Sequence, residues 1–189
     1  ADLIANAKRP FILAGHGILL SGASKEVIRL SEKANIPLSW TLLGSGAVPA
    51  SHDLNMGMMG MHGEFAANNA IQKADLLIAC GMRFDDRVTG NTRTYSLDSK
   101  KIHIEIDPSE INKNVPVDVA LVGDLKLVLN KLIPIINNQQ NNEWINEIEK
   151  WKEESQSRDI INADTQMLYG AQVISCLLYT SPSPRDRTR

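Results

Sequence analysis

The sequence contains little cysteine, few aromatic residues and no long apolar run. Only two of its 189 residues are cysteine, and Cys80 and Cys176 are far apart and lack the C-x-x-C spacing of a zinc site. Neither a zinc centre nor a disulfide framework is indicated, so we expect two reduced thiols in a cytoplasmic protein. The apolar runs, such as Leu76 to Cys80, are too short to cross a bilayer of about 30 Å. We therefore expect no membrane span.

The sequence also has no large excess of positive or negative charge, because the formal net charge is only -2. Such a balance does not indicate a nucleic-acid or membrane-surface partner. The histidines lack ligand spacing with one another or with a cysteine, so we propose no metal site. Neither a G-x-S-x-G motif nor a P-loop is present. The sequence therefore contains no complete active site, and we assign no catalytic residue.

Short runs rich in Ile, Leu and Val alternate with stretches of helical period, which predicts parallel strands joined by crossover helices. We expect an α/β fold, a doubly wound parallel sheet of about six strands with helices on both faces. The predicted strands are 10–14, 37–41, 74–80, 101–106 and 117–122, and the predicted helices are 24–35, 64–73 and 125–133. Residues 55–63, NMGMMGMHG, have neither period, and we expect a loop.

The chain divides by composition into four parts. Residues 1–136 form the main domain, and the polar run NNQQNN at 137–142 opens a linker with a charged helix that extends to residue 162. In that helix Trp144, Ile148 and Trp151 form one stripe, and we expect it to pack on its own subunit; an interaction surface is the alternative. A second helix is predicted from about Gln166, so 163–176 would begin a further domain. Residues 177–189 are predicted to be a disordered tail that resembles a translated adapter sequence rather than native chain.

The most polar cluster follows a predicted strand. Arg83, Asp85, Asp86 and Arg87 stand within five positions, at the carboxyl end of a parallel strand, where doubly wound folds bind ligands. Guanidinium groups there can hold an anion while a carboxylate accepts a hydroxyl. A surface ion-pair network that caps the strand is an equally good interpretation.

Other candidate positions are each open to two interpretations. Gly15-His16-Gly17 is half of a dinucleotide fingerprint or only a tight turn. Asp107 could receive a ribose, although an N-cap is slightly favoured, and Asp124 both caps a helix and places backbone near a nucleotide. His62, among glycines and methionines, suits either a planar ligand or ordinary core packing.

Seven segments, in one order and register, resemble the catalytic large subunit of acetolactate synthase from about Ala1 to Val173. They are KRPFILAGHG (8–17), SGAS (21–24), NIPLSWTLLGSGAVP (35–49), GMMGMHGEFAANNAI (57–71), ADLLIACGMRFDDRVTG (74–90), IHIEIDPSEINKN (102–114) and VDVALVGD (117–124). The series is specific, whereas each segment alone is modest. The resemblance implies a central-domain fragment, cut from a longer thiamine-diphosphate enzyme, that is inactive alone.

The resemblance also implies a reaction and its cofactors. Enzymes of this family condense two 2-ketoacids with decarboxylation, on thiamine diphosphate anchored by Mg²⁺, in isoleucine and valine biosynthesis. They carry FAD without a net redox part, and they assemble as homodimers or homotetramers of catalytic subunits with a small regulatory subunit. The thiamine diphosphate and metal would be held outside this chain, whose own cofactor would be FAD.

Site residues follow from the resemblance position by position. Arg87 and Met61 correspond to residues that face the second ketoacid. The residues expected to bind FAD are Gly15, His16, Thr41, Leu42, Gly44, Gly60, His62, Gly81, Arg83, Asp85, Glu105, Ile106, Asp124 and Leu125. His16 stands where many members have Gly, and Glu105 where Asp is usual. Another thiamine-diphosphate carboligase or oxidase, or a stand-alone dinucleotide-binding module, is the alternative.

Overall fold

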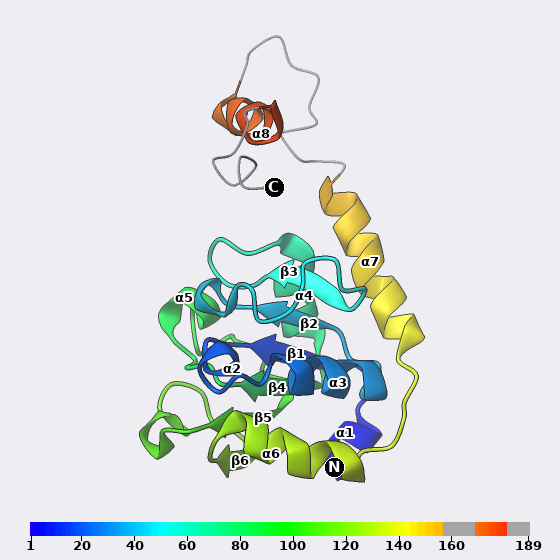
Figure 1. Cartoon of the computed structure of the whole chain (residues 1–189), viewed down its shortest axis with the longest axis vertical. Helices are drawn as coiled ribbons and strands as arrows, with labels where there is room; N and C mark the ends of the chain where they lie inside the picture. The colour runs from blue at the N-terminus through cyan, green and yellow to red at the C-terminus, as the bar shows by residue number, and fades with distance from the viewer. Residues whose placement is uncertain (157–168, 181–189) are drawn as a thin grey trace, which may run out of the picture. The chain divides into compact units, whose positions relative to one another are not determined.

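The computed structural model of the chain describes residues 1–156 and 169–180 (Figure 1). It divides into two compact units, Ala1–Glu149 and a second that begins at Lys150. The first unit contains the sheet and every residue predicted to bind a cofactor or a ketoacid.

Six parallel strands form one sheet, which confirms the predicted fold class. They are β1 (Pro10–Ala14), β2 (Leu38–Trp40), β3 (Asn55–Met58), β4 (Leu76–Cys80), β5 (Lys100–Glu105) and β6 (Val119–Val122). Their order across the sheet is β3-β2-β1-β4-β5-β6. Chain order therefore reverses between β1 and β4, which pair in register from Pro10↔Leu76 to Ala14↔Cys80. That reversal is the switch point at which doubly wound sheets bind ligands.

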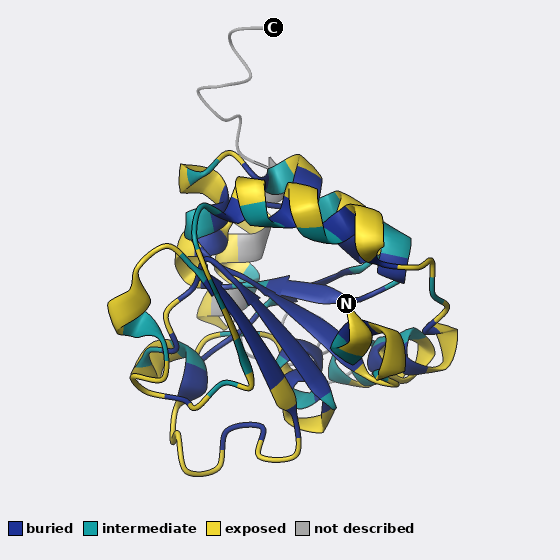
Figure 2. Cartoon of the chain, turned by 90° about the horizontal axis from the view of Figure 1, so that it is seen from below, coloured by how far each residue is buried: buried dark blue, intermediate teal, exposed yellow. Residues whose placement is uncertain are grey.

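Both faces of the central strands are buried, and Figure 2 shows them as the buried layer of this unit. Alternate side chains such as Ile12, Ile78 and Ile104 join one apolar cluster with helices α3 (Ser24–Ala34) and α6 (Leu125–Leu132). The opposite face carries Leu13 and Leu77, both fully buried. Helix α4 (Phe65–Lys73) contributes none of its buried residues to the first cluster and covers this second face.

The helices follow the predicted positions closely, with several short additions. They are α1 (Asp2–Asn6), α2 (Gly17–Leu20), α3 (Ser24–Ala34), α4 (Phe65–Lys73), α5 (Asp86–Thr89), α6 (Leu125–Leu132), α7 (Asn142–Gln156) and α8 (Gly170–Thr180), with 3-10 turns η1 (Leu42–Gly44), η2 (Pro108–Glu110) and η3 (Ile133–Ile135). The described helices include none long and apolar enough to cross a membrane.

Strand β3 lies where the sequence predicted a loop. It pairs with β2 through Leu38↔Asn55 and Trp40↔Met58, with an irregular register between the two pairs. Gly57 in its middle has a φ of +91°, so the strand is bent and has no regular alternation. A four-residue edge strand of Gly and Met has little β propensity of its own, which is why its sequence gave no strand signal.

The amide-rich run after residue 136 is tied to the first unit rather than standing apart from it. The Asn141 side-chain amide donates to the carbonyls of Ala34 and Asn35, at 2.9 and 3.2 Å, and the Gln139 amide donates to Ile4. The compact unit continues to Glu149, so residues 137–142 lie within it, and the domain boundary at 136/137 stays a prediction. The sequence did not predict these contacts, because the run has no apolar residue and its side-chain amides bond to backbone groups.

The first half of α7 packs on the same unit. Trp144 is 2% exposed and donates its indole N–H to the Pro10 carbonyl at 3.1 Å, and Ile148 is fully buried. The stripe is thus accounted for at these two positions by packing within the chain, as expected. Helix α8 runs to Thr180, so residues 177–180 are helical where the predicted tail begins. The predicted positions at 157–168 and 181–189 lie outside the described residues.

Two carboxylates fasten the amino ends of the strands. Asp75 accepts from the backbone N–H groups of Lys8 and Arg9, at 2.7 and 2.9 Å, and so links the starts of β1 and β4. Asp118 accepts from the Lys100 ammonium at 2.9 Å and the Lys101 backbone at 2.8 Å. Desolvation raises the pKa of Asp118, but these hydrogen bonds and the charges of both lysines outweigh it and leave the pKa lowered.

Candidate functional site

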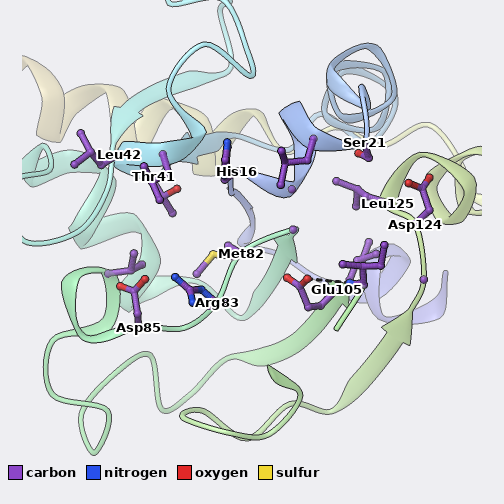
Figure 3. A pocket seen from close by; sticks show the side chains of 18 of the residues that line it. His16, Ser21, Thr41, Leu42, Met82, Arg83, Asp85, Glu105, Asp124 and Leu125 are labelled. Carbon is purple, nitrogen blue, oxygen red and sulfur yellow. Dashed lines mark hydrogen bonds between the residues drawn. The ribbon is translucent and has the colours of Figure 1, made fainter. Parts of the chain in front are cut away.

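A cavity of about 630 Å³ lies at the carboxyl edge of the sheet, beside the switch point. Its walls come from the ends of β1, β2, β4, β5 and β6, and Figure 3 shows their side chains around one open space. The lining residues are His16, Gly17, Leu20, Ser21, Thr41, Leu42, Leu43, Gly81, Met82, Arg83, Asp85, Arg87, Val88, Ile104, Glu105, Ile106, Gly123, Asp124 and Leu125. Five strand ends that are far apart in the sequence thus meet at one site.

Glycines let the loops after β1, β2 and β4 approach one another beneath this cavity. A Cβ on Gly15 would overlap the Gly81 carbonyl, and one on Gly17 would lie 2.7 Å from the Gly81 Cα. A Cβ on Gly44 would overlap the Ala14 carbonyl. Gly81 itself has a φ of +58°, a conformation that favours glycine. The cavity floor is therefore bare backbone, held by Gly15 N–H to Cys80 at 2.9 Å and Gly17 N–H to Gly81 at 2.8 Å.

Arg83 is exposed and extends toward the cavity from the loop after β4 (Figure 3). Among residues 1–156 and 169–180, its guanidinium group makes neither an ion pair nor a side-chain hydrogen bond. Ion pairs in those ranges, such as Lys100–Asp118 and Lys113–Glu110, do not involve Arg83. A network that caps the strand, one of the two interpretations of this cluster, is thus not formed, and a cationic group is left at the cavity.

The acidic residues of the site mainly bind nearby backbone. Asp85 caps α5 by accepting from the Arg87 N–H at 3.1 Å, and Asp124 caps α6 by accepting from Leu127 at 3.0 Å. Glu105 accepts from the Ile106 N–H at 2.9 Å. Each uses one carboxylate oxygen for the bonds described, so the second oxygen remains available to a hydroxyl.

Asp107 is the N-cap of η2 and lies outside the cavity lining. It accepts from the Ser109 N–H at 2.8 Å, and hydrogen bonding to Ser109 lowers the pKa of this exposed carboxyl. The cap interpretation of Asp107 is confirmed.

Ten of the residues predicted to bind a cofactor line the cavity. They are His16, Thr41, Leu42, Gly81, Arg83, Asp85, Glu105, Ile106, Asp124 and Leu125. Gly15 and Gly44 lie behind the lining, packed against backbone. Gly60 and His62 are not brought into it, although a Cβ on Gly60 would lie 2.6 Å from the Arg87 carbonyl.

The two residues predicted to face a ketoacid contact each other. The Met61 N–H donates to the Arg87 carbonyl at 2.8 Å, and Arg87 Nη1 lies 3.7 Å from Met61 Sδ. Arg87 also lines the cavity, whereas Met61 is 59% exposed outside it. The structure therefore joins the 55–63 loop to the cluster after β4.

Apolar lining residues were missed by sequence reasoning. Leu20 is 76% exposed and Leu43 62% exposed, and Ser21, Met82 and Val88 also contribute. Leu20 belongs to α2, a helix that was not predicted because its four residues are too few to show a period. The sequence did contain a signal in the pairs Leu19-Leu20 and Leu42-Leu43. Each pair stands beside a glycine turn, where leucine side chains are poorly placed to be buried in the core.

Cys80 ends β4 directly beneath the site but does not serve it. Complete burial raises the pKa of its thiol to about 12, so the sulfur stays protonated and is a poor nucleophile or metal ligand. The site thus offers a cation, carboxylates and an imidazole between apolar walls. Such walls suit a ligand with an anionic centre and flat apolar ends.

The strand order and the position of the cavity define a doubly wound α/β domain with an open cavity at its switch point, the place where such folds bind ligands. The chain belongs to the family described as thiamine pyrophosphate enzyme, central domain, which matches residues 1–132.

Curated relatives have similar sequences over most of this chain. A probable acetolactate synthase large subunit of Methanococcus aeolicus is 47% identical over 165 residues, covering 81% of this chain and 28% of the relative. One of Methanocaldococcus jannaschii is 53% identical over 133 residues, covering 70% and 22%. An acetolactate synthase of Mycobacterium leprae is 46% identical over 140 residues, covering 74% and 22%. The chain thus spans about a quarter of the length of these relatives.

Proposed function

We propose that the cavity at the switch point binds FAD. The observation that carries the proposal is the Arg83 guanidinium, which has no partner in the described ranges and stands at the end of β4 beside the cavity. A diphosphate pairs well with a fixed guanidinium group. The cavity of about 630 Å³ also falls within the usual range for cofactor sites.

The residues present fit the two ends of such a ligand. Leu42 is 73% exposed and Ile106 67% exposed, so both offer apolar surface that a flat ring can cover. Glu105 and Asp124 each keep a carboxylate oxygen for a hydroxyl of a ribose or ribityl chain. The residues that would hold FAD are the ten lining residues named above, with Gly15 and Gly44 shaping the floor, and we keep Gly60 and His62 as flavin contacts that the family resemblance implies. When bound, FAD supplies a flavin ring, and we expect it to play no net redox part.

The parent protein is proposed to be an acetolactate synthase. It would condense two 2-ketoacids, with Mg²⁺ and thiamine diphosphate held by parts of the protein outside this chain. Arg87 would pair with the carboxylate of the second ketoacid, and Met61 would lie beside it, because these two side chains already contact each other. We further propose cytoplasmic catalytic subunits that assemble as dimers or tetramers with a regulatory subunit.

Flavin binding is tested by titrating FAD into the 189-residue chain and following both flavin fluorescence and backbone amide NMR signals. Arg83→Gln is expected to weaken binding by about tenfold or more, because a charge-assisted hydrogen bond is lost. Arg93→Gln is the matched control, since Arg93 is exposed and lies outside the cavity lining. Equal affinity of all three proteins, or no response of the Gly81 amide up to millimolar FAD, would contradict the proposal.

The reaction is tested in the full-length parent with thiamine diphosphate, Mg²⁺ and FAD. Acetolactate should form from pyruvate, and absence of product with all cofactors bound would contradict the assignment. We expect the isolated chain to retain FAD only weakly during purification, because flanking domains complete the site. Stoichiometric flavin absorbance in the purified chain would show that expectation to be wrong.

A further inference from the structure

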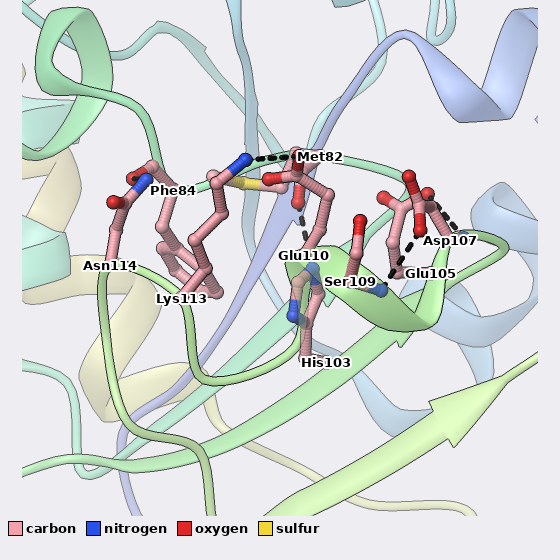
Figure 4. A network of polar contacts seen from close by, with 9 residues as sticks. All are labelled: Met82, Phe84, His103, Glu105, Asp107, Ser109, Glu110, Lys113 and Asn114. Atoms are coloured by element: carbon pink, nitrogen blue, oxygen red, sulfur yellow. Dashed lines mark hydrogen bonds and ion pairs between the residues drawn. The ribbon is translucent and has the colours of Figure 1, made fainter.

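Three consecutive carbonyls anchor the backbone around Arg83. The Met82 carbonyl contacts His103 Nε2 at 2.8 Å, the Arg83 carbonyl accepts from the Asp85 N–H at 2.8 Å, and the Phe84 carbonyl accepts from Asn114 Nδ2 at 2.8 Å. Two of these partners are side chains from elsewhere in the chain, one from β5 and one from the loop after η2 (Figure 4). The backbone on both sides of Arg83 is therefore fixed by side chains that do not line the cavity.

His103 can serve this contact in only one way. A carbonyl oxygen only accepts, so Nε2 must carry the proton and donate to Met82. His103 is fully buried, and its Nδ1 has no hydrogen-bond partner among the described residues. Burying a histidine whose second nitrogen has no hydrogen-bond partner costs free energy, and an apolar side chain could pack there without that cost. Its single polar contact is thus the hydrogen bond to the Met82 carbonyl.

Aromatic rings also pack against the segment that contains Arg83. The Phe84 ring meets the His103 ring edge-on, with centroids 5.1 Å apart, and the Tyr95 ring at 6.1 Å. Phe84 and Met82 are each 4% exposed, whereas Arg83 between them is exposed. Both neighbours of Arg83 are thus held by packing, while the Arg83 side chain between them faces the ligand space.

We infer that His103 and Asn114 are positioning residues, which hold the Met82 and Phe84 carbonyls so that the backbone from which the Arg83 side chain projects is fixed in advance for the anionic part of its ligand. The inference rests on the proposed flavin site. A side chain that is already placed loses less freedom on binding, so affinity depends on the residues that place it. Neither residue touches the ligand space, and both act through Arg83.

A double-mutant cycle on the 189-residue chain tests this. FAD affinity is measured by NMR titration for wild type, Arg83→Gln, His103→Leu and the double variant, well below each melting temperature. Arg83→Gln and His103→Leu are each expected to weaken binding about tenfold, and the double variant no further than Arg83→Gln alone, because His103 acts through Arg83. Effects that multiply, or a His103→Leu affinity equal to wild type, would overturn the inference while the flavin site itself stands.

Rescue separates positioning from simple stabilisation. His103→Gln places an amide N–H near the Nε2 position and should restore most of the affinity, even where its melting temperature stays low. Ser31→Ala, which removes a buried hydrogen bond of 2.6 Å from Ser31 Oγ to the Ile36 carbonyl away from the cavity, should lower stability but leave affinity unchanged. Loss of affinity in Ser31→Ala to the same extent as in His103→Leu would mean that any destabilised variant binds poorly, and would overturn the inference.

Asn114 provides a second arm if His103→Leu does not fold. Asn114 is exposed, so Asn114→Ala should fold and still weaken binding several-fold, again without adding to Arg83→Gln. An Nε2–H proton of His103 that exchanges slowly in ¹⁵N NMR is the expected signature of the bond. Absence of FAD binding by wild type would remove the flavin site and this inference together, whereas an Asn114→Ala affinity equal to wild type would remove only the inference.

Discussion

A Cβ on Gly15 would overlap the carbonyl oxygen of Gly81, so the loops after β1 and β4 can cross only because residue 15 has no side chain. The neighbouring atoms are backbone and the Met82 Cβ, which cannot rotate away. The sequence pattern Gly-His-Gly is therefore a packing requirement at the switch point, before any ligand is considered.

Gly15→Ala should lower the free energy of unfolding by about 1–3 kcal/mol, because a methyl group is forced into a closed contact. Urea denaturation of the chain measures this. Gly22→Asn is the control, since Gly22 has open space around it and a φ of +63° that asparagine tolerates. Equal destabilisation by both substitutions would show that the contact with Gly81 is not the cause.

Asn141→Ala should destabilise the first unit by about 1–3 kcal/mol, because the carbonyls of Ala34 and Asn35 lose a shared donor at a buried site. Thermal unfolding provides the measurement. Asn138→Ala, in the same amide-rich run but exposed, should change stability by less than about 0.5 kcal/mol. If both variants melt like wild type, residues 137–142 are a linker after all.

The two thiols should react very differently. Cys176 is exposed, whereas burial raises the pKa of Cys80 to about 12, so a thiol reagent at pH 8 should modify one cysteine rapidly in the native chain and both in denaturant. Cys176→Ser should then react only when unfolded. Rapid labelling of native Cys176→Ser would contradict the burial of Cys80.

Asp118 gives the sheet a stability that depends on pH. Its folded pKa is lowered, so the stabilisation is present above the unfolded pKa of about 3.9 and is lost as pH falls through the lower folded pKa. The free energies of unfolding of wild type and Asp118→Asn, measured by urea denaturation, should therefore differ at neutral pH and converge in acid. For a pair so exposed the difference should be less than about 1 kcal/mol. Asp98→Asn, an exposed control, should show no such convergence.

The sheet was predictable because its central strands are continuous apolar runs. Pro10–Ala14 and Leu76–Cys80 are buried at every position, and this burial is written directly in their Ile, Leu and Ala content. Strand β3 was not predictable, because its hydrogen bonds to β2 come from tertiary pairing and its residues, NMGM, carry no strand pattern. The role of the 137–142 run was hidden for a similar reason, since amide side chains on backbone carbonyls leave no periodic trace.

At the candidate site, sequence located the polar residues but not what they contact. Arg83 and Asp85 follow a strand, and that position alone indicates the ligand edge. Whether Arg83 is paired could not be read from RFDDR, because ion pairing depends on how side chains are directed in the loop after β4 and in the four-residue helix that follows it. The contributions of Leu20 and of His103 were missed, since both arise from packing between segments distant in sequence.

The hydrogen bonds of two carboxylates hold the sheet together at its amino edge, which is the edge opposite the cavity. The residues that stabilise the fold are thus separate from those that line the cavity. Asp75 and Asp118 join strand starts at the amino edge, while every loop that lines the cavity leaves from the carboxyl edge. Residues that line the cavity, other than the glycines where the loops cross, can therefore be exchanged one at a time while the hydrogen bonds at the amino edge stay in place. The domain is therefore a scaffold on which new ligand preferences can be engineered.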